Sequence, residues 1–319
     1  MPLLKRYGAR AEQNAGAERG LVIMRDAATP SAGQRWPGQL PAGEKPGILR
    51  TCANPRCGSG WLRLWRSREA PVFEGGWCCS AACTLACVEA ALGREMDARG
   101  AARETYRHRI PLGLAMLEQG WITQGELRTA LAAQRAAGSG RLGEWLIRQR
   151  SSSEELVTRA LGLQWGCPVL SMDFHNPEDL TALLPRLFID AFGALPLRVA
   201  ASQILYLSFE DRIDPALALA TERMTGLRVE AGLVQGSLFR PAHARALESR
   251  FPPVELIEAA TEQALAMALT RALEESRPVE ARLVRIHDCL WLRIWRRRQA
   301  GPLPEPGSIR DLIASTAAH

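Results

Sequence analysis

Lysine is nearly absent from this chain of 319 residues, which has 38 arginines but only two lysines, Lys5 and Lys45. Neither lysine lies in a glycine-rich loop that leads into a helical pattern. A Walker-type phosphate-binding loop needs a lysine that reaches the outer phosphates of a nucleotide, and Schiff-base chemistry needs a lysine amine. The sequence therefore excludes a Walker-type ATPase site and disfavours lysine-dependent catalysis.

Long apolar runs and common catalytic motifs are also missing. No stretch of about 18 uncharged apolar residues occurs, so the sequence predicts no membrane span. The N-terminus lacks the apolar core of a secretory signal peptide, and we expect a cytoplasmic protein. The motifs G-x-S-x-G, H-E-x-x-H and H-x-E with C-x-x-C are absent, and the five histidines are scattered. We therefore expect a protein that is not an enzyme.

Shifts in composition and periodicity divide the chain into five parts. A first tail, rich in Gly, Ala, Pro and charge, is predicted to be disordered. A cysteine-rich segment predicts a zinc finger, and helical patterns then give way to alternating strands and helices. We expect an α+β multidomain protein with these parts: tail 1–46, finger-like domain 47–100, helical and α/β domain 101–251, C-terminal α-ββ unit 252–299, and tail 300–319.

The α/β part has clear local signals for its elements. Asn176 and Asp214 are predicted helix caps, each followed by a proline at the first helical position. Gly226 is a predicted helix end. The expected elements are strands at 167–173, 195–201, 204–210 and 227–234, with helices after Asn176, at 215–225 and from about 238.

Two prolines, Pro252-Pro253, mark the start of the C-terminal unit. Residues 254–276 predict an amphipathic helix, and 279–298 predict a hairpin that turns near His287-Asp288. The last residues predict only a short helix at 308–314. One side of the long helix carries Leu256, Ala260, Ala264, Met267 and Ala268, and a stripe of Leu265, Leu269 and Leu273 widens it.

An internal repeat links residues 111–134, PLGLAMLEQGWITQGELRTALAAQ, with residues 141–164, RLGEWLIRQRSSSEELVTRALGLQ. Each copy predicts a helix, a turn and a second helix. The second helices have predicted capping boxes, Thr123 with Glu126 and Ser152 with Glu155. The leucines fit a buried face. A glycine at a helix start costs about 0.5–1 kcal/mol relative to alanine, so it indicates close approach of another backbone or of a ligand.

The repeat resembles the tandem motif R-L-G-x-x-L-x-x-x-G-x-x-x-x-x-x-L-x-x-x-L-x-x-Q of type II secretion and type IV pilus assembly ATPases. This motif belongs to their N-terminal domain, the GspE N-terminal or MshEN domain. The downstream segments SMD, LLP, ALPLRVAASQILYLSFEDRIDPAL and MTGLRVE resemble that domain in the same order, so the resemblance covers about 105–250. It implies tandem helical hairpins, a small α/β domain, and a stand-alone relative of the regulatory part without the motor.

Some members of that family bind cyclic di-GMP through the two motifs, so the resemblance implies a candidate dinucleotide site. An arginine can stack on guanine or donate to its edge, and a helix start can approach phosphate. Pro111 and Arg150 replace the Arg and Gly of the motif, and the spacer 135–140 is one residue longer than usual. The candidate ligand-binding residues are Leu112, Gly113, Gln134, Arg141, Leu142, Gly143 and Gln164.

Six of the eight cysteines lie within 36 residues, which in a cytosolic protein favours a metal over disulfides. Two close pairs separated by 21 residues suit tetrahedral zinc, and the C-S-x-x-C form resembles small treble-clef fingers. Cys78 is then expected to point elsewhere, and Cys87 is an alternate ligand. Buried free thiols are the other interpretation. The predicted structural zinc ligands are Cys52, Cys57, Cys79 and Cys83.

A second, shorter internal repeat relates WLRLWRSR at 61–68 to WLRIWRRR at 291–298. As strands, both place Trp, Arg and Trp on one face. That face is either a stiff, partly buried strand face, a partner surface, or a nucleic-acid stacking platform. The net charge of +6 is modest and does not by itself imply nucleic acid.

These features favour an adaptor or regulatory protein that contacts other proteins and is a candidate for cyclic di-GMP binding. The expected protein partner is a platform or motor component of a secretion or pilus system. The alternative is a zinc-containing nucleic-acid-binding regulator that uses the Trp/Arg strands.

Overall fold

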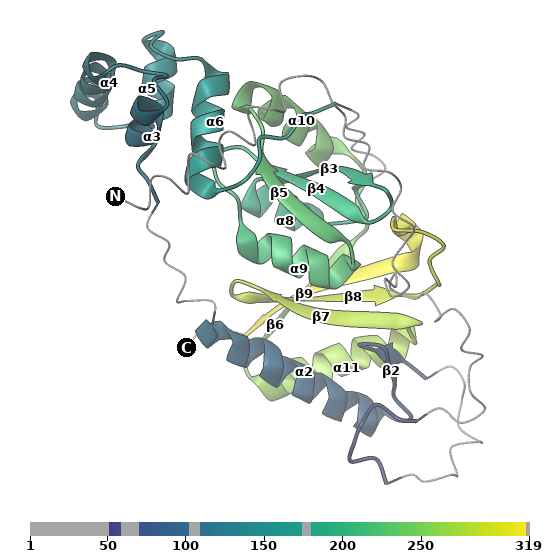
Figure 1. Ribbon diagram of the computed structural model, residues 1–319. Coiled ribbons are helices and arrows are strands. Elements are labelled where there is room, and N and C mark those ends of the chain that lie inside the picture. Colours follow the sequence, from purple (N-terminus) through teal and green to yellow (C-terminus); the bar gives the residue numbers. More distant parts are fainter. Residues whose placement is uncertain (1–50, 59–69, 102–108, 174–179, 317–319) are drawn as a thin grey trace. The chain divides into compact units, whose positions relative to one another are not determined.

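The computed structural model describes residues 51–58, 70–101, 109–173 and 180–316 (Figure 1). The predicted N-terminal tail, the Trp/Arg copy at 61–68 and the predicted cap Asn176 lie outside these residues. Within the described ranges, no helix has the length and apolar character needed to cross a membrane.

The repeat forms two helix pairs, as predicted. The first copy gives α3 (Leu112–Glu118) and α4 (Gln124–Ala137), and the second gives α5 (Leu142–Arg148) and α6 (Glu154–Trp165). Thr123 caps α4 in the predicted box with Glu126. The box predicted for Ser152 and Glu155 is wrong, because Ser153 is the N-cap of α6 and accepts from Leu156 N at 3.2 Å.

A three-stranded sheet follows the repeat. Its strands are β3 (Ala194–Ala200), β4 (Ile204–Phe209) and β5 (Arg228–Leu233), in the order β3-β4-β5. β3 and β4, which match the strands predicted at 195–201 and 204–210, pair as an antiparallel hairpin. β4 and β5 are parallel because α9 (Pro215–Thr225) connects them. Helices α8 (Arg186–Phe192) and α10 (Gly236–Glu248) flank this unit in the chain.

The predicted caps of α9 are confirmed, whereas the strand predicted at 167–173 is not. Asp214 and Gly226 cap α9 as predicted, and Asp214 Oδ1 accepts from Leu217 N at 2.9 Å. The strand predicted at 167–173 is reduced to a single bridge between Val169 and Leu233. The apolar residues of that stretch instead run beside the end of β5.

The C-terminal part is a four-stranded sheet in the order β6-β9-β8-β7. The predicted hairpin is confirmed as β7 (Glu280–Ile286) and β8 (Cys289–Trp295). The predicted helix 254–276 is wrong at its start, which forms β6 (Val254–Ala259) before α11 (Glu262–Ser276). The predicted tail contains β9 (Ile309–Thr316), and not a helix at 308–314, because this segment pairs with both β6 and β8.

The buried face of α11 differs from the predicted one. Leu256 and Met267, which were expected on the main apolar side, are exposed. The predicted side stripe, Leu265, Leu269 and Leu273, is the face that packs into the core. Leu256 belongs to β6 rather than to the helix, whereas Met267 lies in α11 on the side away from the core.

The cysteine-rich segment shares a core with this C-terminal sheet. It forms β1 (Val72–Phe73), β2 (Gly76–Trp77) and α2 (Ala81–Ala101). Phe73 and residues of α2 pack with α11 and with Leu290, Leu292 and Ile294 of β8, and α2 runs beside α11 (Figure 1). The first and last described parts of the chain therefore form one hydrophobic core.

The opposite face of the same sheet is also buried. Trp291, Trp295 and Ile313 pack with Phe188 and Met224 from the α/β unit, and the Trp291 ring meets Phe188 edge-on at 5.3 Å between centroids. The predicted Trp/Arg face of β8 is therefore an interior face rather than a surface.

Candidate dinucleotide cavity and metal centre

Helices of one repeat copy pack against helices of the other copy. α3 of the first copy contacts α6 of the second, and α4 contacts α5. The final glutamine of each copy binds the chain just before the Leu-Gly pair of the other copy. Gln134 Nε2 donates to Gly140 O at 2.8 Å, and Gln164 Nε2 donates to Ile110 O at 2.8 Å. Each glutamine amide therefore holds in place the backbone that precedes a helix starting with Leu-Gly.

The Leu-Gly glycines lie where two helices meet. A Cβ atom at Gly113 would sit 2.7 Å from Leu127 Cδ1, and one at Gly143 would sit 2.7 Å from Val157 Cγ1. Leu127 and Val157 occupy equivalent positions in the two copies. Close packing of helices is thus sufficient to require both glycines.

A cavity of about 590 Å³ lies between the second repeat copy and the α/β unit. Five of the seven candidate ligand-binding residues line it: Leu112, Arg141, Leu142, Gly143 and Gln164. Gly113 and Gln134 do not. Three aromatic residues also line the cavity and were not predicted, because they are far apart in the sequence and carry no motif: Trp165, Phe192 and Phe239.

The cavity has mixed charge. Three arginines line it, Arg141, Arg212 and Arg240, together with four carboxylates. Arg141 forms an ion pair with Asp211, so an anionic ligand would have to compete with that aspartate. The hydrogen bonds that Arg240 donates to Glu210 Oε1, at 2.9 and 2.6 Å, raise the pKa of Arg240 and keep it cationic.

Two further contacts fix the walls of the cavity. Ser237 N, at the start of α10, donates to Glu154 Oε1 at 2.8 Å and so ties α10 to α6. The Arg109 guanidinium lies over the Trp165 ring, with its Cζ atom 3.3 Å from the ring centroid. The first contact holds the second repeat copy against the α/β unit, and the second ties the segment before α3 to the end of α6.

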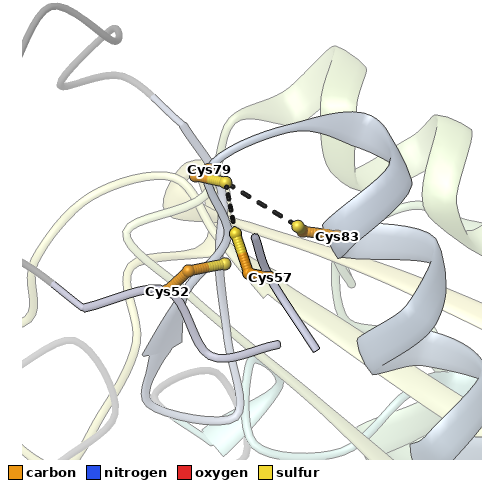
Figure 2. Close-up of side chains that lie close together, drawn as sticks. All are labelled: Cys52, Cys57, Cys79 and Cys83. Atoms are coloured by element: carbon orange, nitrogen blue, oxygen red, sulfur yellow. Dashed lines mark hydrogen bonds between the residues drawn. The ribbon is translucent and has the colours of Figure 1, made fainter. Parts of the chain in front are cut away.

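The four predicted zinc ligands come together. The sulfur atoms of Cys52, Cys57, Cys79 and Cys83 all lie within 4.8 Å of one another (Figure 2). Cys57 Sγ is 3.5 Å from Cys79 Sγ, and Cys79 Sγ is 3.7 Å from Cys83 Sγ. Tetrahedral zinc with Zn–S bonds of about 2.3 Å places its sulfur ligands roughly 3.8 Å apart. The cluster could therefore hold a metal ion of that size.

In the absence of a metal ion, burial raises the pKa of the Cys52 thiol to about 12. A thiol that binds a metal must lose its proton, so at this place only a bound cation could stabilise the thiolate. Cys79 and Cys83 flank the first residue of α2, so the helix start positions one pair of ligands. Cys78 points into the core with Phe73, and Cys87 lies outside the four-sulfur group.

No family model matches the chain. Bacteriophage adsorption protein B of Escherichia coli K12 and bacteriophage N4 adsorption protein B of E. coli O157:H7 are each 35% identical over 125 residues, 39% of this chain and 16% of theirs. The type IV pilus assembly ATPase PilB of Thermus thermophilus is 29% identical over 136 residues, 42% of this chain and 15% of PilB. The chain thus spans about one sixth of the length of the curated relatives that it matches.

Two solved structures are also similar. MshE with cyclic di-GMP is 23% identical, covers 43% of this chain and 99% of its own, and has a TM-score of 0.35. The N-terminal domain of XpsE is 22% identical, covers 42% of this chain and 92% of its own, and has a TM-score of 0.30. The sequence match to PilB agrees with the resemblance read from the tandem motif. This chain contains a domain like the N-terminal domain of type II secretion and type IV pilus ATPases.

Proposed function

We propose that this chain is a non-catalytic adaptor or regulatory protein, which binds a cyclic dinucleotide and contacts a component of a secretion or pilus system. The observation that carries the ligand part is the cavity, whose wall contains Arg141, Leu142 and Gly143 of the repeat copy that keeps the motif arginine. The family resemblance assigns these positions to cyclic di-GMP.

The chemistry of the cavity supports such a ligand. Arg141 is largely exposed, and its guanidinium can exchange Asp211 for a guanine edge or a phosphate. The aromatic residues of the cavity offer rings on which a base can pack. Of the two copies, only the second supplies the motif arginine, so the proposed site recognises its ligand with one motif arginine, Arg141.

The non-catalytic role is supported by the chemistry that the chain does not offer. Both lysines lie outside a glycine-rich loop, so the sequence offers no lysine for a Walker-type phosphate-binding loop. The proposed role is therefore one of binding rather than of ATP hydrolysis. A platform or motor protein of the same machinery is the partner that fits this role.

The four-cysteine cluster is proposed to hold a structural zinc. Four thiolates leave no open coordination position for a reacting water, so the metal would stabilise the fold. It would hold β1, β2 and the start of α2 in place, and these elements pack on the C-terminal sheet.

Equilibrium dialysis with labelled cyclic di-GMP tests the proposed function. We expect saturable binding to the full chain and a loss of about 10- to 100-fold in affinity for Arg141→Ala, the effect of losing a charged hydrogen bond. Arg128→Ala is the matched control, since Arg128 is an exposed arginine of α4 that does not line the cavity. Equal affinities for the two variants would reject the proposed site.

The nucleic-acid alternative loses its main support. Trp291, Arg293 and Trp295 are buried in the core, so this copy of the Trp/Arg strand offers no stacking surface. We therefore do not propose nucleic acid as the ligand.

A further inference from the structure

The two edges of the C-terminal sheet differ in what covers them. At the β7 edge, Val72 N donates to Pro278 O at 3.1 Å and Glu74 N donates to Ala281 O at 2.7 Å, so β1 lies along it. At the other edge, β6 pairs with β9 and with no other strand of the described residues. An edge strand of this kind presents a row of N–H and C=O groups that another chain can pair with.

A row of apolar side chains crosses the sheet and ends in solvent at this edge. Val284, Trp291, Ile313 and Leu256 lie opposite one another on successive strands. Their exposed fractions are 2%, 0%, 7% and 69%. The row is buried until β6, where the Leu256 side chain is exposed.

The exposed edge is acidic. Residues 254–262 contain three glutamates and no lysine or arginine. Glu255 is paired with Arg310 inside the sheet at 2.7 Å, but its side chain remains half exposed. Glu258 lies on the same face as Leu256, is exposed, and forms no ion pair with a described residue. Along β6, residues 255–258 therefore read Glu-Leu-Ile-Glu, with Leu256 and Glu258 on one face and Glu255 and the half-buried Ile257 on the other.

We propose that β6 is a docking edge that accepts an extended segment of a protein partner by strand addition. The segment fits when apolar side chains lie opposite Leu256 and Ile257, and basic side chains lie opposite Glu255 and Glu258. A segment of the form Arg-Val-Val-Arg meets this pattern in either direction, since Glu-Leu-Ile-Glu has the same polarity read both ways. A second copy of this chain fits less well, because two β6 strands would bring their glutamates together.

Binding of synthetic peptides to the full chain tests the proposal. The probe is a fluorescent peptide Thr-Arg-Val-Val-Arg-Thr, compared with Thr-Glu-Val-Val-Glu-Thr and with the basic peptide N-methylated at alternate residues. Fluorescence anisotropy should show saturable binding of the basic peptide only. N-methylation should abolish it, because strand addition uses the peptide N–H groups, whereas simple charge attraction would survive.

Matched variants locate the site. Glu258→Lys should lower the affinity for the basic peptide by at least about ten-fold and allow the acidic peptide to bind, as expected when a charge at the rim of an interface is reversed. Leu256→Thr should weaken binding of the basic peptide as well, and Leu219→Thr should not, although Leu219 is a similarly exposed leucine at 59%. Hydrogen exchange should slow in 254–259 when the peptide binds. Equal binding by Glu258→Lys, by the N-methylated peptide, or a concentration-dependent dimer through β6 would overturn the proposal.

Discussion

Gln134 and Gln164, thirty residues apart, donate the same hydrogen bond to the backbone in front of the partner copy's Leu-Gly pair. The repeat is thus a reciprocal structure, in which each copy ends by holding the start of the other. We expect Gln134→Ala and Gln164→Ala to lower the free energy of unfolding by about 1 kcal/mol each. Urea denaturation measures this, with Gln124→Ala in exposed α4 as the control. A cost no larger than that of the control would contradict the reciprocal structure.

The Leu-Gly glycines should not tolerate a methyl group. Gly113→Ala and Gly143→Ala place a Cβ 2.7 Å from Leu127 and Val157, and we expect each to destabilise the fold by about 1–3 kcal/mol. Gly125→Ala in α4 is the control, since its Cβ would meet nothing closer than 3.9 Å. This substitution should stabilise by about 0.5–1 kcal/mol. Thermal unfolding measures these effects. If the unfolding temperature shifted in the same direction for all three variants, packing would not explain the glycines.

The buried ion pair of the C-terminal sheet should be sensitive to the loss of one partner. Arg293 and Asp311 are each 1% exposed, and they share two hydrogen bonds of 2.7 Å. Asp311 also accepts from Trp291 Nε1 at 2.7 Å, and Arg293 donates to Leu183 O at 3.0 Å. Asp311→Ala should therefore cost about 3–5 kcal/mol of unfolding free energy, because it leaves a buried charge without its partner.

A second pair of variants separates this effect from simple truncation. Arg293→Met with Asp311→Leu should cost less than Asp311→Ala alone, since the double variant leaves no unpaired charge. Glu275→Ala, which breaks the exposed ion pair with Arg271, should cost at most about 0.5 kcal/mol. Denaturant unfolding of the wild type and the three variants gives the comparison, and a double variant that costs as much as Asp311→Ala or more would contradict this expectation.

The proposed zinc should be counted by elemental analysis. We expect about one zinc per chain in the wild type and a loss of most of it in Cys79→Ser, because three thiolates bind zinc less tightly than four. Cys289→Ser is the control, as Cys289 lies in β8 outside the four-sulfur group. Chelation should also increase hydrogen exchange in α2. A wild-type protein free of zinc after purification in its presence would contradict the proposal.

Local signals in the sequence predicted the elements that depend on neighbours in the chain. The Thr123 box, the α9 caps at Asp214 and Gly226, and the β7–β8 hairpin are all of this kind. The strands β6 and β9 were not predicted from the sequence. They pair with each other although they lie more than fifty residues apart, and no short turn connects them. Residues 254–259 directly precede a strong helical pattern, and the predicted helix was extended over them.

The candidate sites differ in the same way. The four cysteines could be chosen from spacing, because metal geometry limits which pairs can meet. For the dinucleotide cavity, the motif identified one wall, but Asp211, Phe192 and Phe239 come from the α/β unit and carry no sequence signal. The burial of Arg293 could not be foreseen either, since its partner Asp311 lies in a segment predicted to be a tail.

Isothermal titration of cyclic di-GMP into the full chain, at two temperatures, tests the central claim most directly. We predict saturable binding with one ligand per chain and micromolar or tighter affinity, lost in Arg141→Ala. That result would show that one motif arginine is sufficient for the ligand. No binding heat at either temperature would contradict the claim, and would leave a docking module that keeps the family's fold without its dinucleotide.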